Sequence, residues 1–451
     1  MCPFMSEYDV IIIGGGPAGI SATRVFGQAT SGLRIALIMP EPHSMIYCAM
    51  PYVIEGEILI EKTFKADTLV TDNGVDLIHD KVIEVNFKAR EITTASGNKY
   101  CCQKLLIATG ARPILPNIAG SQLPGVMTFK TEGDLSAVME AVESGLNKVV
   151  VVGAGAIGIE LAQALKARGV EVHLVDMQDH ILPALVDQEM VAEAQKMLQD
   201  NGIILYLNNK VVALEGDNSV REVAMANGER ISFGMEGGLV VFCVGMKADI
   251  DLFRGTELAL GRNGILVNAG METNLAGVYA AGDCVEYKSA LTGKVIEGKL
   301  ATNAVPMGKV AARCILGEKA EYAGFYNGAA TKIYDLRIGG TGFTERAATE
   351  NGYTPITGYG ETTTRFPIIP GAKKVKIKLI ADKDSKRIIG GQVVGGEAVA
   401  ERVDVITFAI QKMATANELA ALSYAAQPYQ SFYPANNAIV MAAEEIASKL
   451  K

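Results

Sequence analysis

Two glycine-rich loops have the residue types and the spacing needed to bind the phosphates of a dinucleotide. The first runs from Gly14 to Gly19 and the second from Gly153 to Gly158, and both read Gly-x-Gly-x-x-Gly. In this pattern the first glycine makes a tight turn, the second lets the backbone approach a pyrophosphate, and the third lets a helix pack on a strand. The N-terminus of that helix then faces the phosphates. Two such loops in one chain predict two dinucleotide sites.

An acidic residue follows the second loop at the distance expected for a ribose ligand. The predicted strand 170–175 is followed directly by Asp176. A carboxylate there accepts hydrogen bonds from the adenosine ribose and repels a 2′-phosphate, and the next three residues include no arginine. The pattern favours NADH over NADPH, the alternative being that Asp176 only caps the strand. Glu160, just after the loop, either lies on the helix surface or approaches the nicotinamide.

Each loop requires a strand before it and a helix after it, and the sequence supplies both. Continuous apolar runs at 9–13 and 148–152 are typical of buried parallel strands, and helical patterns follow the two loops. This predicts a duplicated βαβ, α/β architecture with two Rossmann-like domains. After residue 324 the pattern alternates, as in strands, at 375–380 and 388–394 and then becomes helical, which predicts a third, α+β domain.

The composition argues against several other classes of protein. The net charge is -8, whereas nucleic-acid binding requires a basic surface. No apolar run reaches the roughly 18 residues of a membrane helix, and no basic segment precedes the first apolar run, so we expect a cytoplasmic protein. The seven cysteines are scattered without a Cys-x-x-Cys pair, and the four histidines lack ligand spacing. We therefore expect neither a disulfide framework nor a metal site.

Four motifs in sequence order resemble those of the two-dinucleotide-binding-domain flavoproteins. They are the two glycine loops, the segment 105–113 with its Ala-Thr-Gly, and the segment 273–283, which ends in Gly-Asp. The resemblance covers essentially the whole chain and extends to the pyridine nucleotide-disulfide oxidoreductases. It implies the following domains: FAD-binding at 1–117 and 247–323, NAD(H)-binding at 118–246, and dimerisation at 324–451.

The resemblance also assigns ligands to both cofactors. The expected FAD ligands are Gly14, Gly16, Pro17, Ala18, Gly19, Glu41, Ser44, Val82, Ala108, Thr109, Gly110, Arg112, Gly282, Asp283 and Ala301. The expected NAD ligands are Gly153, Gly155, Ala156, Ile157, Gly158, Glu160, Asp176 and Gly245. Asp283 is expected to hold the ribityl chain of FAD. The sequence departs from the family where strand 34–39 should end in an acidic residue, because Met39 stands there and Glu41 is the nearest substitute.

The cysteine pattern resembles one branch of this family. The Cys-x-x-x-x-Cys pair and the C-terminal His-Pro of glutathione and lipoamide reductases are missing, whereas segment 44–54 resembles the single-cysteine branch. That branch contains coenzyme A-disulfide reductases, NADH oxidases, NADH peroxidases and persulfide reductases. The resemblance implies that Cys48 lies beside the flavin as the reactive thiol, although a lone cysteine is more often a small buried hydrophobe. Its oxidised forms would be a mixed disulfide, a persulfide or a sulfenic acid.

A C-terminal segment is expected to complete the active site of a second subunit. Residues 422–429 resemble the Tyr-Ala-Pro-Pro stretch of the branch, which reaches the opposite subunit's site. Tyr424 or Tyr429 would supply a proton there, the alternative being aromatic packing at the dimer interface. Lys62 and Lys65 follow the cysteine segment and could point at the flavin or at solvent, and solvent is the default expectation for lysine.

These patterns together predict a homodimeric FAD enzyme that takes a hydride from NADH. The expected acceptor is a disulfide, persulfide, polysulfide or coenzyme A disulfide that reacts at Cys48. Coenzyme A stays a candidate, although only Arg24 on the first helix could meet its phosphates. An NADH oxidase that reduces oxygen is the alternative. A ferredoxin- or rubredoxin-reductase-like electron-transfer protein is an alternative from another class, against which the acidic charge and the Cys48 segment argue.

Overall fold

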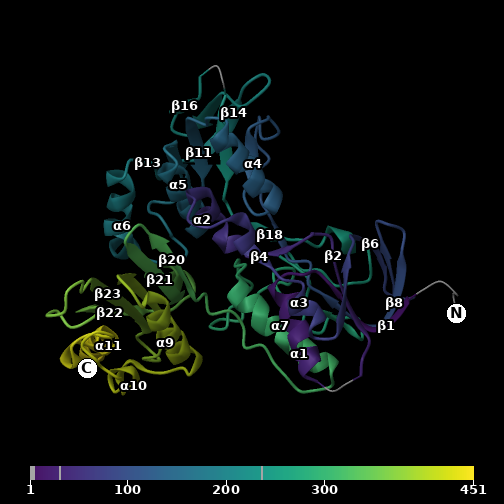
Figure 1. The fold of residues 1–451 in the computed structure, drawn as a ribbon. Helices are drawn as coiled ribbons and strands as arrows, with labels where there is room; N and C mark the ends of the chain where they lie inside the picture. Colours follow the sequence, from purple (N-terminus) through teal and green to yellow (C-terminus); the bar gives the residue numbers. More distant parts are fainter. Residues whose placement is uncertain (1–5, 30–31, 235–236) are drawn as a thin grey trace. The chain divides into compact units, whose positions relative to one another are not determined.

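The computed structural model describes residues 6–29, 32–234 and 237–451, which form two compact units. Each unit contains one of the glycine-rich loops (Figure 1). Unit 1 consists of the described residues up to Val53 together with Ile58–Ile114 and Gly245–Phe325, and unit 2 of Ile54–Glu57, Leu115–Val244 and Tyr326–Lys451.

Unit 1 is built on a mostly parallel sheet with the strand order β5-β2-β1-β8-β7-β6, to which β19 adds by pairing with β8. Its strands are β1 (Ser6–Ile13), β2 (Ile35–Met39), β5 (Val75–His79), β6 (Val82–Asn86), β7 (Glu91–Thr94), β8 (Lys99–Ile107) and β19 (Val278–Ala280). Strand β2 and residues 10–13 of β1 are continuous apolar runs because both faces of a parallel sheet are covered. The helices α1 (Pro17–Gln28) and α7 (Ala301–Ile315) pack on each other and contribute to the same core.

Shorter elements carry the cysteine segment and the return of the chain into this unit. Strands β3 and β4 pair antiparallel, and so do β9 and β18. The bounds are β3 (Ser44–Met45), η1 (Tyr47–Ala49), α2 (Met50–Glu55), η2 (Ile60–Thr63), β4 (Phe64–Lys65), α3 (Thr68–Thr71), β9 (Ala111–Pro113), β18 (Met246–Ala248) and η3 (Asp251–Phe253), where η denotes a 3-10 helix.

The first part of unit 2 repeats the α/β arrangement around a parallel sheet of order β10-β17-β11-β12-β13. An antiparallel sheet, β14-β15-β16, accompanies it. The bounds are β10 (Val126–Thr128), α4 (Glu132–Glu143), β11 (Lys148–Val152), α5 (Ala156–Ala167), β12 (Glu171–Val175), α6 (Gln188–Asp200), β13 (Ile204–Tyr206), β14 (Val211–Glu215), β15 (Glu222–Met225), β16 (Arg230–Ser232) and β17 (Leu239–Phe242).

The C-terminal part of unit 2 is an antiparallel sheet of order β20-β21-β24-β23-β22 with helices packed on it. Glycines let helix α11 approach strand β22 closely, because a Cβ on Gly358 would lie 2.1 Å from the carbonyl oxygen of Ala442. The bounds are β20 (Ala329–Ile333), β21 (Leu336–Gly342), α8 (Glu345–Glu350), β22 (Pro355–Thr363), β23 (Lys374–Asp382), β24 (Ile388–Gly395), α9 (Val399–Gln411), α10 (Ala416–Ala420), η4 (Pro434–Asn436) and α11 (Ala438–Lys449).

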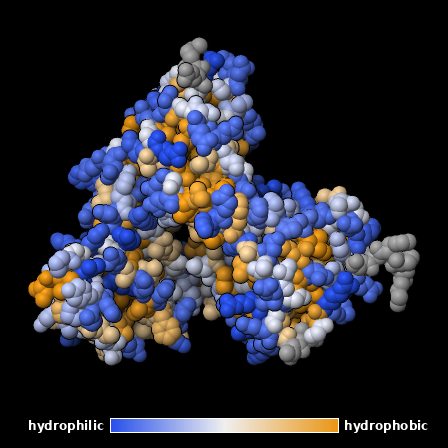
Figure 2. Space-filling model, in the orientation of Figure 1, coloured by the Kyte–Doolittle hydropathy of each residue, from blue (hydrophilic) through white to orange (hydrophobic). Residues whose placement is uncertain are grey.

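The face visible in Figure 2 is mainly polar, with smaller apolar patches. Among the residues that the structure describes, no helix is both long enough and apolar enough to cross a bilayer.

Candidate active site

The two glycine loops have nearly the same backbone geometry. The first glycine of each has a positive φ, +113° at Gly14 and +110° at Gly153. The third glycine of each packs against the first, since a Cβ on Gly19 or Gly158 would lie only 2.1 or 1.9 Å from that glycine's carbonyl oxygen. Side chains at these four positions would strain the turn or push the helix away from the strand.

The second glycines, Gly16 and Gly155, face open space. A Cβ at either position would meet no atom within 4 Å, and both residues have ordinary extended backbone angles. Each is the N-cap residue of its helix, α1 or α5, and because it is a glycine it has no side chain that could cap the helix. The first N–H groups of a helix have no partners within the helix, so both loops offer a cradle that fits a pyrophosphate.

The two loops differ in the residue that supports them at the end of the neighbouring strand. Beside the second loop, one carboxylate oxygen of Asp176 accepts the N–H of Ala154 at 2.6 Å and the other accepts the N–H of Gln178 at 2.8 Å. Beside the first loop, Met39 is buried, and its sulfur fills the space where a Cβ of Gly15 would stand. A carboxylate therefore supports only the second loop at this place.

The substitute that the sequence suggests for the first loop, Glu41, is exposed in the turn after β2. Its carbonyl oxygen lies 2.9 Å from Nδ1 of His79. The role of Glu41 at the FAD ribose stays a prediction. Ser44 contacts the loop directly, because its hydroxyl donates to the carbonyl of Gly15 at 2.7 Å.

Replacing Asp176 by alanine together with Met177→Arg is expected to shift the preference from NADH towards NADPH. Hydrogen bonds to a charged group are worth about 1.5–3 kcal/mol, so the ratio of kcat/KM values for the two nucleotides should change by about 10- to 100-fold. Met177 is 62% exposed, so an arginine there has room. Steady-state kinetics with both nucleotides measures the ratio, with Met177→Arg alone as the control. An unchanged ratio would show that Asp176 only caps the strand.

The Gly-Asp motif lies beside the first loop. A Cβ on Gly282 would be 2.9 Å from the Cβ of Ala18, so the two segments touch. The adjacent Asp283 accepts a hydrogen bond of 2.9 Å from the hydroxyl of Tyr287, whose side chain is almost fully buried. The structure thus brings the predicted ribityl ligand next to the predicted pyrophosphate cradle.

A lysine that the sequence analysis missed also lies near Asp283. The ammonium of Lys299 is 4.7 Å from the ring centroid of Tyr287 and donates to the carbonyl of Val285 at 3.0 Å. Burial lowers the pKa of Lys299, and the negative charge of Asp283 opposes this shift. Neither Tyr287 nor Lys299 belongs to a motif that the sequence analysis used.

The Ala-Thr-Gly segment follows β8 and contacts the segment that returns to unit 1. The hydroxyl of Thr109 donates to the carbonyl of Asp249 at 2.7 Å, and Gly110 has a φ of +75°. Arg112 forms ion pairs with Asp249 and Asp251. Arg112 is thus anchored by carboxylates of the returning chain, and its contact with FAD stays a prediction.

The remaining predicted ligands occupy the starts of elements or the loops between them. Ala108 directly follows β8, Val82 is the first residue of β6, and Ala301 is the first residue of α7. Gly245 lies between β17 and β18 with a φ of +106°. Pro17 begins α1, and Ala156 and Ile157 begin α5.

Glu160 is neither on an open helix surface nor free of partners. Its carboxylate accepts a hydrogen bond of 2.6 Å from the hydroxyl of Thr331 on β20. Burial raises the pKa of Glu160, while this hydrogen bond opposes the shift. Its approach to a nicotinamide stays a prediction.

Cys48 lies on η1 and its side chain is exposed. Strand β3 precedes Cys48 and strand β4 follows it, and their antiparallel pairing places Ser44 opposite Lys65. Burial lowers the pKa of Lys65, and the negative charge of a Cys48 thiolate opposes this shift. Lys65 thus departs from the solvent default, because it is partly buried and interacts electrostatically with Cys48.

Other cysteines lie in surroundings that suppress their reactivity. Burial raises the pKa of the thiols of Cys102 and Cys243 to about 12 and that of Cys284 to about 11. Cys243 and Cys284 lie just after β17 and β19 rather than within strands. Thiols with such pKa values are almost entirely protonated at neutral pH and react slowly. Cys2 lies outside the described residues.

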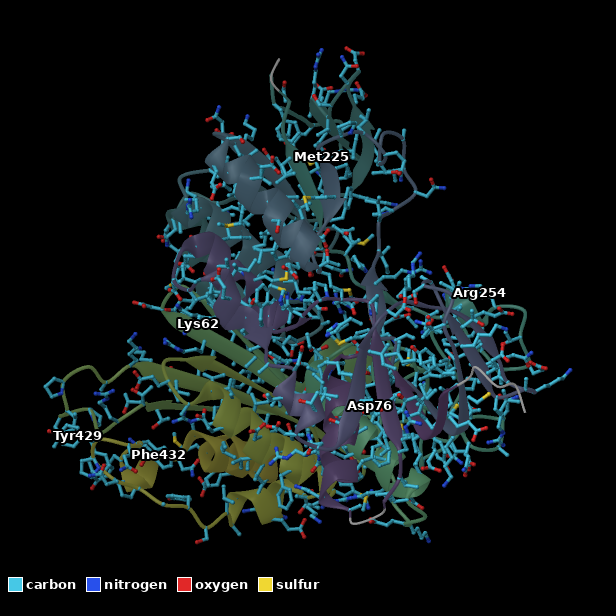
Figure 3. All side chains as sticks on the ribbon, turned by 45° about the vertical axis from the view of Figure 1, so that its right-hand side comes forward. Lys62, Asp76, Met225, Arg254, Tyr429 and Phe432 are labelled. Carbon is cyan, nitrogen blue, oxygen red and sulfur yellow. The ribbon has the colours of Figure 1, made fainter. Side chains whose placement is uncertain are left out.

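The two predicted proton donors lie on the C-terminal loop before α11. The hydroxyl of Tyr424 donates to the carbonyl of Pro434 at 2.7 Å, and its ring packs edge-on against Phe432. Tyr429 is 66% exposed and lies on the same C-terminal loop as Phe432 (Figure 3). Their role in proton transfer stays a prediction.

Two phosphate cradles of this kind, a Gly-Asp segment beside the first and an exposed thiol on the segment whose Ser44 binds the first loop define a class of enzyme. This class is the oxidoreductases that pass electrons from a nicotinamide nucleotide through a flavin. The chain belongs to the pyridine nucleotide-disulphide oxidoreductase family, whose model matches residues 8–308. A second model, the dimerisation domain of this family, matches residues 329–435. The predicted fold class and the prediction of FAD and nicotinamide cofactors are confirmed.

Several relatives cover nearly the whole chain. An NADH oxidase of Methanocaldococcus jannaschii is 35% identical, over 98% of this chain and 99% of its own length. A CoA-dependent NAD(P)H sulfur oxidoreductase of Pyrococcus furiosus is 31% identical, over 89% of this chain and 90% of its own. The solved structure of an NAD-dependent persulfide reductase from A. fulgidus superposes with a TM-score of 0.89 at 30% identity, covering 98% of this chain and 83% of that one.

Proposed function

We propose that this enzyme uses NADH to reduce a sulfur–sulfur bond through Cys48. The observation that carries the proposal is the setting of this thiol, which is exposed and lies four residues after Ser44, whose hydroxyl binds the first dinucleotide loop. Lys65 interacts electrostatically with Cys48, and the thiolate form of a cysteine is its nucleophilic form. The Pyrococcus furiosus and A. fulgidus relatives, by their names, act on sulfur compounds and persulfides, which supports the same reaction class.

The chemistry requires two steps at Cys48. Its thiolate attacks one sulfur of an acceptor R–S–S–R′, so that a mixed disulfide Cys48–S–S–R forms and R′S⁻ leaves and takes up a proton. Bound FAD supplies hydride acceptance from NADH and two-electron transfer to this bond. Cleavage returns the Cys48 thiolate and releases RSH after protonation, which we assign to Tyr424 or Tyr429 of a second subunit. The sum is NADH, one proton and R–S–S–R′ giving NAD⁺, RSH and R′SH.

Oxygen is the second candidate acceptor. The Methanocaldococcus jannaschii relative is an NADH oxidase, and oxygen needs no binding motif of its own. We further propose that the enzyme is a homodimer in the cytoplasm. The dimerisation-domain match supports the dimer, and the scattered cysteines without a Cys-x-x-Cys pair support a reducing compartment.

Competition between acceptors tests the main proposal. The enzyme is reduced anaerobically with NADH and mixed in a stopped-flow instrument with oxygen, coenzyme A disulfide or polysulfide, while flavin absorbance is followed. We expect a sulfur acceptor to reoxidise the flavin fastest. Reoxidation by oxygen that is faster than by every sulfur acceptor would replace the proposal with the oxidase function.

Lys65→Met is expected to slow alkylation of Cys48 by iodoacetamide at pH 7. The variant removes the positive charge that interacts with the sulfur of Cys48, so the sulfur loses a favourable electrostatic partner. The rate is measured by mass spectrometry of the Cys48 peptide. Lys62→Met is the matched control, since Lys62 lies on η2 three residues away and is exposed. Equal alkylation rates in the two variants would show that Lys65 does not act on the sulfur.

A further inference from the structure

A lysine of the C-terminal sheet is completely buried among carboxylates. The side chain of Lys378 on β23 is 0% exposed, and its ammonium lies 2.8 Å from a carboxylate oxygen of Asp187 and 2.8 Å from one of Glu345. It also contacts the carboxylate of Glu189. A buried charge is costly unless it is fully paired, and here the three carboxylates surround the ammonium. They would suit a metal ion, but Lys378 already occupies the place between them.

Through Asp187, the cluster of Lys378 and its three carboxylates contacts the nucleotide-binding part of unit 2. It is the N-cap residue of α6 and ends the segment 177–187 that follows Asp176. Gln392 of β24 binds it twice, donating to its carboxylate at 2.5 Å and accepting its backbone N–H at 2.9 Å. The backbone N–H of Glu345 also donates to its carboxylate. Residues from β23, β24 and α8 therefore fix the end of this segment.

The C-terminal sheet contacts the middle of the same segment as well. The side-chain amide of Asn327 donates to the carbonyl of Ala184 at 3.0 Å. Gly340 on β21 lies so close that a Cβ there would be 2.3 Å from the carbonyl oxygen of Leu185. The segment is thus held by the C-terminal part of unit 2 at Ala184 and Leu185 as well as at its end.

The segment in turn supports the second glycine loop. The backbone N–H of Leu182 donates to the carbonyl of Ala154 at 2.9 Å, and Leu182 is buried with a φ of +56°. The N–H of Ala154 donates to Asp176. Ala154 lies between Gly153 and Gly155, so both polar groups of its backbone are held by the strand end and by the segment that Lys378 anchors.

We propose that Lys378 is a positioning residue for NADH binding, which holds segment 177–187 closed on the second glycine loop through Asp187. The proposal rests on the proposed NADH site at that loop. It predicts that Lys378 affects binding of the adenosine half of the nucleotide and not the rate of hydride transfer, because the contacts from Lys378 lead to Ala154 in the loop that is proposed to hold the pyrophosphate. A purely structural role would instead lower stability without changing the affinity of the folded enzyme.

The test is Lys378→Met in the FAD-loaded full-length enzyme. ADP-ribose, which carries no nicotinamide, is titrated by isothermal calorimetry, and flavin reduction by NADH is measured anaerobically without a sulfur acceptor. We expect the Kd for ADP-ribose and the NADH concentration at half-maximal rate to rise at least about fivefold, since breaking a buried pair is strongly disruptive. The limiting rate should stay within about twofold. Hydrogen exchange should increase in 177–187.

Two further variants separate positioning from general damage. Lys374→Met is the matched control, since Lys374 lies on the same face of β23 and is 85% exposed, and it should leave the affinity unchanged. Lys378→Arg keeps the positive charge and should recover most of the affinity.

Normal ADP-ribose affinity in folded Lys378→Met would overturn the proposal. If that variant does not fold, Asn327→Gly decides. It removes the bond to Ala184 without leaving a buried charge, and glycine tolerates the positive φ of this position. Unchanged affinity in it would also overturn the proposal. Absence of ADP-ribose binding in the unmodified enzyme would contradict the NADH site itself. If the proposed Cys48 chemistry were wrong, these binding and flavin-reduction measurements would still test the role of Lys378, because none of them uses a sulfur acceptor.

Discussion

Cys48→Ser is expected to lower the turnover of sulfur acceptors by at least about 100-fold, because the sulfur that attacks the acceptor is lost. Serine has nearly the same size but is not a thiolate, so it forms no mixed disulfide. Reduction of the flavin by NADH needs no thiol and should proceed at the unmodified rate. Anaerobic stopped-flow measurement of both half-reactions, with coenzyme A disulfide and polysulfide as acceptors, gives the two rates separately.

Cys101→Ser is a suitable control for this experiment. Cys101 belongs to the same unit and is only partly buried, so it tests whether any accessible thiol can take over. Full sulfur reductase activity in Cys48→Ser would contradict the proposed function. The oxygen reaction separates the two candidate functions further. In an oxidase, Cys48 would reduce hydrogen peroxide to water and become a sulfenic acid, so Cys48→Ser would release hydrogen peroxide instead of water.

The sequence predicted the local parts of the fold well. Both strand–loop–helix units follow from short apolar runs and glycine spacing, which depend on neighbouring residues only. Helix α5 begins at Ala156, within the glycine loop, rather than after it, because Gly155 is itself the N-cap residue. The departure at Met39 was also visible in the sequence. Only the structure explains how it is tolerated, since the thioether packs into the space beside Gly15.

The missed site residues share a physical cause. Lys378 and Asp187 are 191 positions apart in the sequence, and no periodic pattern predicts that two such distant residues form an ion pair. In the sequence Lys65 looks like an ordinary surface lysine, and only the structure shows that the β3–β4 pairing places it opposite Ser44. Burial decides the electrostatics of these groups, and burial depends on packing between distant segments.

The paired loops allow a reciprocal test of the two cofactor sites. Gly16→Val is expected to weaken FAD binding by at least about 100-fold, or about 2.7 kcal/mol, because the added side chain enters the space left for the pyrophosphate. The protein itself should still fold, since no atom lies within 4 Å of the new Cβ and the backbone angles suit any residue. FAD retention during purification and flavin fluorescence titration of the apoprotein measure the loss.

Gly155→Val is the matched substitution in the second loop, with the same open surroundings and backbone angles. It should retain FAD fully but raise the NADH concentration needed for half-maximal flavin reduction by a similar factor, because this loop is assigned to the nicotinamide nucleotide alone in the proposed function. A Gly14→Ala variant should differ from both. Its Cβ would lie 2.2 Å from the carbonyl oxygen of Ala108 at a positive φ, so the folded protein itself should be destabilised. Loss of FAD from Gly155→Val, or tight FAD binding by Gly16→Val, would contradict the assignment of the two loops to their cofactors.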